Sequence, residues 1–229
     1  TLSVTTVISR AITYGTTASD SISAYYLPSG QTMYLRDGND SGQGSQFNDT
    51  IYGEGGDDYI YAYAGNDTVD GGTGNDQVYG DEGNDTVTVG LGNDYVAAGN
   101  GDDVVLGGDG NDSIYAGAGN DVLTGGTGND TLAGDTGNDT FHFAKGWGAD
   151  VVTDAGYGTG NNADVIQFSD VASTEILFER NNDALVLKRG TTGDVLTLNG
   201  FYTYSGPNPT GQIEQFRFTN TTLDVAAVT

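Results

Sequence analysis

The chain has 229 residues, of which 32 are Asp or Glu and seven are Lys or Arg, giving a formal net charge of -25. This charge excludes nucleic-acid-binding proteins that use a basic surface, and Lys- and Arg-rich helices that bind membranes. The absence of Cys excludes disulfides and thiolate metal sites, and the single His142 excludes a His-rich zinc site. No apolar run is long enough for a transmembrane helix, and the N-terminus lacks the pattern of a cleavable signal peptide.

Glycine accounts for 38 residues, about one in six, whereas Pro accounts for three. This content is too high for an ordinary helical domain and lacks the strict three-residue period of collagen. An acidic chain of this kind is either disordered or carries an acidic surface. Aromatic residues make up 10% of the chain, with 14 Tyr, which argues against disorder. We therefore expect a folded protein in which something neutralises the acidic side chains.

Residues 1–34 are interpreted as a β-rich lead-in. They contain two ragged units, around Asp20-Ser21-Ile22 and Gln31-Thr32-Met33, which resemble the regular repeat that follows.

Residues 35–142 form twelve consecutive nonapeptides. Asn or Asp precedes the repeated Asp in all twelve, Gly stands two residues before it in eleven, and an apolar residue stands two residues after it in eleven. Gly71-Gly72-Thr73-Gly74-Asn75-Asp76-Gln77-Val78-Tyr79 shows the complete unit. The repeated residues are Asp40, Asp49, Asp58, Asp67, Asp76, Asp85, Asp94, Asp103, Asp112, Asp121, Asp130 and Asp139.

Each unit combines a turn with a short strand. The six residues rich in Gly, Asn and Asp favour tight turns and positive φ, and the last three are expected to form a strand whose middle side chain points inward. One unit is then half a coil, and strands on one side pair in parallel. Each half-coil supplies one large inward residue, which makes a thin core, so the coils need a second source of stability.

The unit resembles that of the RTX (repeats-in-toxin) proteins, whose nonapeptides bind calcium. The resemblance covers residues 35–142 and implies an all-β fold, a right-handed parallel β-roll (β-solenoid) with a β-rich C-terminal cap.

The stacked Asp residues are the candidate calcium ligands. Carboxylates of neighbouring coils would repel each other at about 5 Å, and Arg36 is the only Lys or Arg within residues 35–142. Ca²⁺ resolves this conflict because it accepts about 6–8 oxygen ligands, and ten regular repeats leave room for about eight ions. Mg²⁺ fits less well, since it needs small octahedral sites. The expected ligands form two columns: Asp58, Asp76, Asp94, Asp112 and Asp130 in the first, and Asp67, Asp85, Asp103, Asp121 and Asp139 in the second.

Backbone carbonyls of the repeat glycines are expected to complete the calcium shells, because Gly lets a carbonyl turn toward an ion. These residues are Gly56, Gly65, Gly72, Gly74, Gly83, Gly90, Gly92, Gly99, Gly101, Gly108, Gly110, Gly117, Gly119, Gly126, Gly128 and Gly137.

A second candidate site is a Tyr face. Five outward-pointing residues of the regular repeats fall on one sheet, namely Tyr59, Tyr61, Tyr79, Tyr95 and Tyr115. One interpretation is β-propensity combined with cover by another part of the chain, for example residues 1–34. The other is a face that binds a glycan or a protein ligand.

Residues 143–229 are expected to form the β-rich cap. Strand-like runs lie at 165–168, 176–178, 184–187, 195–198 and 213–218, and they indicate antiparallel or mixed pairing. The segments Phe141–Gly148, Asp164–Phe168, Phe178–Arg180 and Gln212–Phe216 resemble the region that follows the repeats in haemolysin-type RTX proteins. That resemblance implies a cap that promotes folding of the roll and an uncleaved signal for type I export near the C-terminus.

The sequence contains no catalytic motif, so we expect no enzymatic activity in this chain. The expected function is that of a calcium-binding RTX module of a secreted protein, located outside the cell or at its surface. Extracellular calcium would fold it, and it would support type I export and an attached functional domain. The alternatives are an adhesin-type module that uses the Tyr face, and the C-terminal part of an RTX enzyme or toxin. Its expected partners are calcium and the type I secretion machinery.

Overall fold

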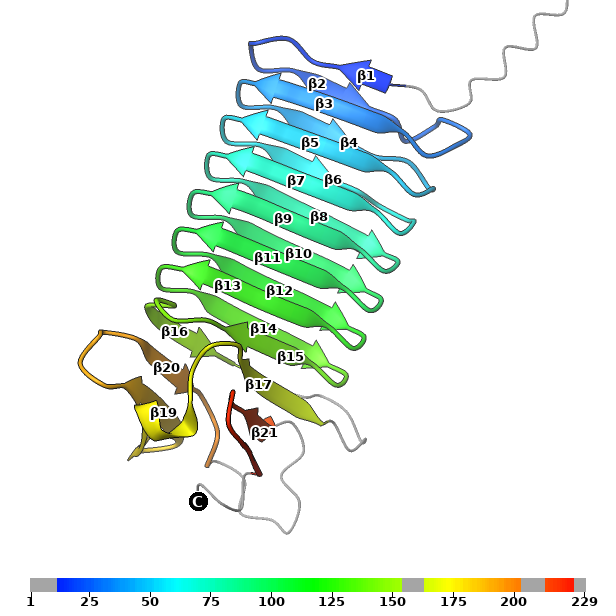
Figure 1. Ribbon diagram of the computed structural model, residues 1–229. Helices are drawn as coiled ribbons and strands as arrows, with labels where there is room; N and C mark the ends of the chain where they lie inside the picture. Colours follow the sequence, from blue (N-terminus) through cyan, green and yellow to red (C-terminus); the bar gives the residue numbers. More distant parts are fainter. Residues whose placement is uncertain (1–11, 154–162, 203–212, 225–229) are drawn as a thin grey trace, which may run out of the picture.

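The protein is a β-solenoid in which two long sheets face each other across a thin core (Figure 1). The computed structural model describes residues 12–153, 163–202 and 213–224. Up to β17, the chain alternates between the sheets, so that each coil contributes one strand to each. The expected parallel β-roll with a β-rich cap is therefore confirmed.

Within the described residues, each sheet has eleven strands. In hydrogen-bonding order, sheet A comprises β1 (Ile12–Tyr14), β3 (Thr32–Asp37), β5 (Thr50–Gly55), β7 (Thr68–Thr73), β9 (Thr86–Leu91), β11 (Val104–Asp109), β13 (Val122–Thr127), β15 (Thr140–Phe143), β17 (Asp164–Phe168), β21 (Ile213–Arg217) and β22 (Thr222–Asp224). In the same way, sheet B comprises β18 (Ile176–Asn181), β19 (Ala184–Arg189), β20 (Val195–Leu198), β16 (Ala149–Val152), β14 (Thr131–Thr136), β12 (Ser113–Ala118), β10 (Tyr95–Asn100), β8 (Gln77–Glu82), β6 (Tyr59–Tyr61), β4 (Ser41–Gln43) and β2 (Ser21–Ser23). One 3-10 turn, η1, covers Ser173–Glu175.

The strands of most repeats are longer than the three residues expected. Strand β8, for example, covers six residues, and its pairing with β10 continues through Asp81↔Gly99. The expectation was wrong because residues with positive φ at the start of the loop still align in parallel register with the next coil, as Gly72 does with Gly90.

The core contains one large side chain per half-coil, as the repeat predicts. The apolar residue of each unit is buried, as Val78 and Ile114 show at 0% exposure. The second inward position, two residues later, holds Gly, Ala or Val, such as Gly80, Ala98 and Val89. Such small residues let the two sheets approach closely, but they bury little apolar area, so the hydrophobic effect stabilises each coil only modestly.

The roll begins before the regular repeats. Strand β1 pairs with β3, and β2 pairs with β4, both in parallel. The two ragged units therefore add coils to the end of the roll, with Met33 fully buried. Residues 12–34 extend the sheets, and the ring of Tyr25 packs against that of Tyr63, which in turn stacks on Tyr61. Cover of the Tyr face by this segment stays a prediction. Residues 1–11 lie outside the described residues.

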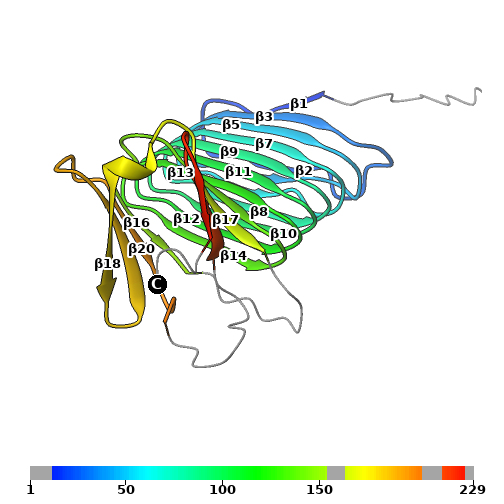
Figure 2. The ribbon, with the colours of Figure 1, turned by 60° about the horizontal axis from the view of Figure 1, so that its bottom comes forward.

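The roll continues beyond the last repeat and then closes. Strands β16 and β17 pair in parallel with β14 and β15, although the nine-residue spacing has ended. Each sheet finishes with antiparallel strands, through β18–β19–β20 in one and β21–β22 in the other (Figure 2). The expected mixed pairing is confirmed. An aromatic cluster, Phe143, Trp147, Phe168, Phe216 and Phe218, fills the end of the core.

Candidate calcium-binding columns

Each repeated Asp is hydrogen-bonded to its counterpart one coil away. The backbone N–H of Asp76 donates to Oδ1 of Asp94 at 2.7 Å, and that of Asp94 donates to Oδ1 of Asp112 at 2.9 Å. The other edge of the roll shows the same contact, for example from Asp85 to Asp103 at 2.7 Å. The fold therefore brings the ten expected Asp residues together as two columns, which we call column one (Asp58 to Asp130) and column two (Asp67 to Asp139).

The second carboxylate oxygen of each of these ten residues has no hydrogen-bond partner. All ten side chains are at most 2% exposed, and their Oδ2 atoms are buried. A buried carboxylate oxygen that lacks a partner carries its full desolvation penalty, and unpaired buried charge is rare in folded proteins. This observation indicates that a cation belongs beside these oxygens.

Burial also raises the pKa values of the column carboxyl groups. The pKa of Asp58, Asp67 and Asp121 is raised to about 7, mainly by desolvation, with neighbouring carboxylates adding to it. Backbone N–H donors oppose the shift only in part. Without a cation, a large fraction of these groups would therefore be protonated near neutral pH.

No side chain of the repeats supplies the missing positive charge. Arg36, the only Lys or Arg of residues 35–142, lies over the ring of Tyr14, with its guanidinium carbon 5.2 Å from the ring centroid. Among the described residues, no three His, Asp or Glu side chains converge to form a metal site on their own. A cation in the columns therefore needs backbone oxygens in addition to the carboxylates, and this donor set suits Ca²⁺.

The repeat glycines are required by the stacking of the coils. At Gly92, Gly110 and Gly128, φ lies between +136° and +145°, and an added Cβ would stand 1.4–1.8 Å from a carbonyl oxygen one coil earlier. All sixteen glycines expected to contribute carbonyls have positive φ. Their role as calcium ligands stays a prediction, since steric necessity alone explains glycine at these positions.

The columns are longer than the sequence predicts. Asp40 and Asp49, from the degenerate repeats, accept from Asp20 N–H and Gln31 N–H respectively. At the other end, Asp150 and Asp164 take the same role toward Asp130 and Asp139. The pattern of Asp followed by an apolar residue two positions later, as in Asp150-Val151-Val152 and Asp164-Val165-Ile166, is the signal that could have revealed this continuation.

Column two extends one step further, because Glu214 accepts a hydrogen bond from Asp164 N–H at 2.7 Å. Desolvation is the main cause that raises the pKa of Glu214 to about 7. No spacing rule predicts this residue, which lies 50 positions beyond Asp164.

The expected Tyr face exists on the outer side of sheet B. Tyr95 and Tyr115 are exposed, at 37% and 39%, and their rings lie 5.6 Å apart. Tyr61 and Tyr79 stack at 4.8 Å, and the Tyr59 and Tyr61 hydroxyl groups are hydrogen-bonded at 2.6 Å. The rings of Tyr79 and Tyr95 lie 5.8 Å apart, so the five residues form one continuous aromatic surface, which we call the Tyr face.

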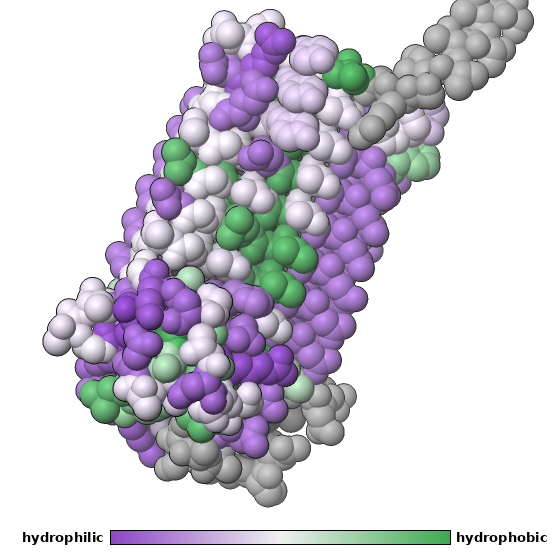
Figure 3. All heavy atoms as spheres, in the orientation of Figure 1, coloured by the Kyte–Doolittle hydropathy of each residue, from purple (hydrophilic) through white to green (hydrophobic). Residues whose placement is uncertain are grey.

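The outer side of sheet A differs from the Tyr face. It carries an apolar patch that includes Leu91, Val104 and Leu106 (Figure 3). Toward the N-terminal end, Tyr14, Tyr34 and Tyr52 stack with centroids 4.9–5.1 Å apart. The repeat does not predict this second ladder, because β1 and β3 lie in the region where the repeat is degenerate.

The roll and its two acidic columns define a metal-binding β-solenoid. The RTX calcium-binding nonapeptide repeat (4 copies) matches residues 34–69, 61–96, 70–105, 97–132, 106–141 and 124–153, which together span more than half of the chain. The haemolysin-type calcium binding protein related domain matches residues 185–227. The chain belongs to the RTX calcium-binding family, and its repeats bind calcium.

Other comparisons add little. No curated protein matches the chain. Among solved structures, the extracellular lipase LipA from Serratia marcescens is similar, with 20% identity and a TM-score of 0.29. The match covers 75% of this chain and 38% of the lipase, so the chain spans well under half of that protein. No helix in the described part of the chain is long and apolar enough to cross a membrane.

Proposed function

We propose that the chain is the calcium-dependent folding module of a secreted protein, located outside the cell or at its surface. The observation that carries this proposal is the row of buried Asp Oδ2 atoms without a hydrogen-bond partner in both columns. At low calcium, as in the cytosol, repulsion between these carboxylates keeps the roll unfolded. Calcium outside the cell neutralises the columns, and its binding free energy contributes directly to folding.

A calcium titration of the whole chain tests this proposal. We expect little β structure at micromolar calcium and a cooperative gain in far-ultraviolet circular dichroism at about 10⁻⁴–10⁻³ M, the range typical of extracellular modules. Addition of a chelator should reverse the gain. Equal β structure at micromolar and millimolar calcium would show that folding is not coupled to the metal.

We extend the proposal to type I export and to an attached functional domain. A chain that folds only outside the cell stays unfolded while it is exported, and its folding at the exit opposes backward movement. Coexpression with a type I exporter should place the chain in the medium, and removal of residues 213–229 should retain it in the cell. Retention of both forms would contradict the proposed export.

A second candidate function is ligand binding at the Tyr face. The exposed rings of Tyr95 and Tyr115 continue an aromatic surface that is suited to stacking on sugar rings. A neutral glycan fits better than an acidic one, because the chain carries a formal charge of -25. A glycan array with calcium should give binding that the variant Tyr61→Ser, Tyr79→Ser, Tyr115→Ser loses, while circular dichroism shows that the variant still folds. Equal binding by both proteins would reject the Tyr face as the site.

The chain also fits as the C-terminal part of an RTX enzyme or toxin. Catalysis would then belong to another part of the parent protein. The gene sequence on both sides of this segment is the direct test, because it would show a catalytic or toxin domain in the same reading frame.

A further inference from the structure

The loop at 146–150 repeats the geometry of a calcium loop although it departs from the nine-residue register. Asp130 N–H donates to Oδ1 of Asp150 at 2.9 Å, across 20 residues, as it would to the next Asp of a regular repeat. Gly148 has φ +89°, and an added Cβ would stand 1.7 Å from Gly128 O, which matches the stacking of the repeat glycines. Ala149 N–H donates to Oδ1 of Asn129 at 3.0 Å, as the Asn residues of the repeats do. Residues 148–150 therefore occupy the last three positions of a repeat loop.

The carboxylates of Asp130 and Asp150 lie on the two sides of the junction between the roll and its cap, and both need a cation. Asp130 and Asp150 are each 1% exposed, and the Oδ2 atom of each is buried without a hydrogen-bond partner. Neither residue belongs to an ion pair among the described residues. The two orphaned oxygens are independent of the stacking geometry, and they point to a ligand at this position.

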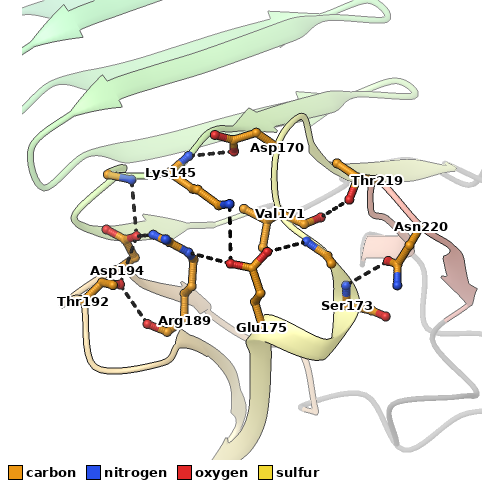
Figure 4. Close-up of polar contacts among 12 residues, drawn as sticks. Lys145, Asp170, Val171, Ser173, Glu175, Arg189, Thr192, Asp194, Thr219 and Asn220 are labelled. Carbon is orange, nitrogen blue, oxygen red and sulfur yellow. Dashed lines mark hydrogen bonds and ion pairs between the residues drawn. The ribbon is translucent and has the colours of Figure 1, made fainter.

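The next acidic residue of the same edge is neutralised by the protein itself. Asp194 contacts the Arg189 guanidinium, and it also accepts from Gly146 N–H at 3.3 Å and from the Thr192 hydroxyl at 3.2 Å (Figure 4). Arg189 further pairs with Glu175 at 3.4 Å. Beyond Asp150, Arg189 therefore supplies the positive charge that the repeats lack. Column one should need no metal ion past Asp150.

We propose that a calcium ion binds between the Asp130 and Asp150 loops and joins the roll to its cap. This site rests on the calcium-dependent function proposed above, and it adds one ion to the number that the regular repeats predict for column one.

The position of the loop gives this ion a structural role. Gly148 O accepts from Val195 N–H at 2.7 Å, and β16 pairs in parallel with both β14 and β20. The same loop carries Trp147, which is 1% exposed and packs against Phe143 and Phe168 at the end of the core. An ion that orders this loop therefore also orders the surface on which the cap assembles.

Trp147 makes the site measurable, because it is the only Trp of the chain. It lies three residues from Asp150, within about 11 Å even for an extended backbone. Terbium, which occupies calcium sites, should therefore luminesce when tryptophan is excited selectively. Native mass spectrometry counts the bound calcium ions of the same protein. Asp150→Asn is the test variant, and Asp109→Asn, at the exposed end of β11, is the matched control.

We expect Asp150→Asn to bind one calcium ion fewer than the unmodified chain and to lose most of the tryptophan-sensitised terbium signal. Terbium signal sensitised by tyrosine should remain, and Asp109→Asn should behave like the unmodified chain. An unchanged ion count and an unchanged tryptophan-sensitised signal would overturn the junction site. If Asp150→Asn does not fold, absence of tryptophan-sensitised signal in the unmodified chain overturns it instead. An unmodified chain that binds no calcium at all would contradict the proposed function as a whole.

Discussion

Asp76 and Asp94 are joined by one short hydrogen bond, 2.7 Å from the backbone N–H of the first to Oδ1 of the second, while Oδ2 of both remains buried and without a partner. One oxygen of each carboxylate thus holds the neighbouring coil, and the other stays available for a metal. The same residue links the coils through the backbone and through the ion, so structural and calcium-binding effects of a substitution must be separated.

Replacing Asp94 separates these effects. Asp94→Asn removes the charge but keeps an oxygen acceptor for Asp76 N–H. Asp94→Ala removes the charge and also leaves that N–H without an acceptor. Loss of a charged partner costs about 1.5–3 kcal/mol. Spread over about eight ions bound during folding, this cost should raise the calcium midpoint by no more than about twofold. Asp94→Ala should raise it further.

Calcium titrations followed by circular dichroism measure both midpoints, with Asp109→Asn as the exposed control. A midpoint for Asp94→Asn equal to that of the control would remove Asp94 from the ligand set.

The pH dependence of the metal-free chain follows from the raised pKa values. Asp58, Asp67 and Asp121 titrate at about 7 in the fold, against an ordinary value of 3.8 in the unfolded chain. The folded state binds protons more tightly than the unfolded chain, so protonation of these carboxyl groups stabilises the fold. This contribution to stability is complete below the unfolded pKa and is lost as the pH rises through about 7. Calcium-free protein should therefore gain β structure when the pH is lowered from about 8 to about 5.

Circular dichroism in calcium-depleted buffer tests this dependence, with calcium-saturated protein at the higher pH as the folded reference. Identical spectra of the calcium-free chain at both pH values would show that protons do not replace the metal.

Glycine at the stacking position should be indispensable even at saturating calcium. Gly110 has φ +139°, and an added Cβ would stand 1.4 Å from Gly92 O. We expect Gly110→Ala to lose about 1–2 kcal/mol through backbone conformation and about 1–3 kcal/mol through steric overlap.

Gly55→Ala is the matched control, because an added Cβ there would meet its nearest neighbour, Thr73 Oγ1, at 3.3 Å. Thermal unfolding should place Gly110→Ala well below Gly55→Ala, and equal melting temperatures would refute the steric account.

The cap should depend on Arg189. Its side chain is 16% exposed and that of Asp194 is 6% exposed, so removal of the guanidinium leaves a largely buried carboxylate without its partner. Removing one partner of a pair whose carboxylate is largely buried destabilises the fold. Arg189→Gln should therefore unfold the cap at lower urea concentration, which the emission of Trp147 reports.

Lys188→Gln is the control for Arg189, since it breaks the Lys188–Glu179 pair, in which both side chains are 42% exposed. Exposed pairs contribute about 0–1 kcal/mol. Equal urea midpoints for the two variants would show that Arg189 does not hold the cap together.

The sequence by itself determined the repeating part of this protein. A strict nine-residue period places Val78 and Val96 in register on the inner face and stacks Asp76 on Asp94, because a strand alternates its side chains and a coil of two strands needs 18 residues. The fold class, the two columns, the common sheet of the five Tyr residues and five strands of the cap, β17 to β21, follow from this period and from local hydrophobic patterns. These patterns do not predict strands β16 and β22.

Only the tertiary structure decided what happens where the period ends. Asp150, Asp164 and Glu214 continue the columns across separations of 20, 25 and 50 residues, and Arg189 meets Asp194 from a hairpin. The backbone N–H groups at the end of the roll can donate to any carboxylate that the following chain places at the same edge of the roll. Once the connecting loops vary in length, packing of the cap around Trp147 and Phe168 selects that carboxylate, and no local spacing rule encodes this choice.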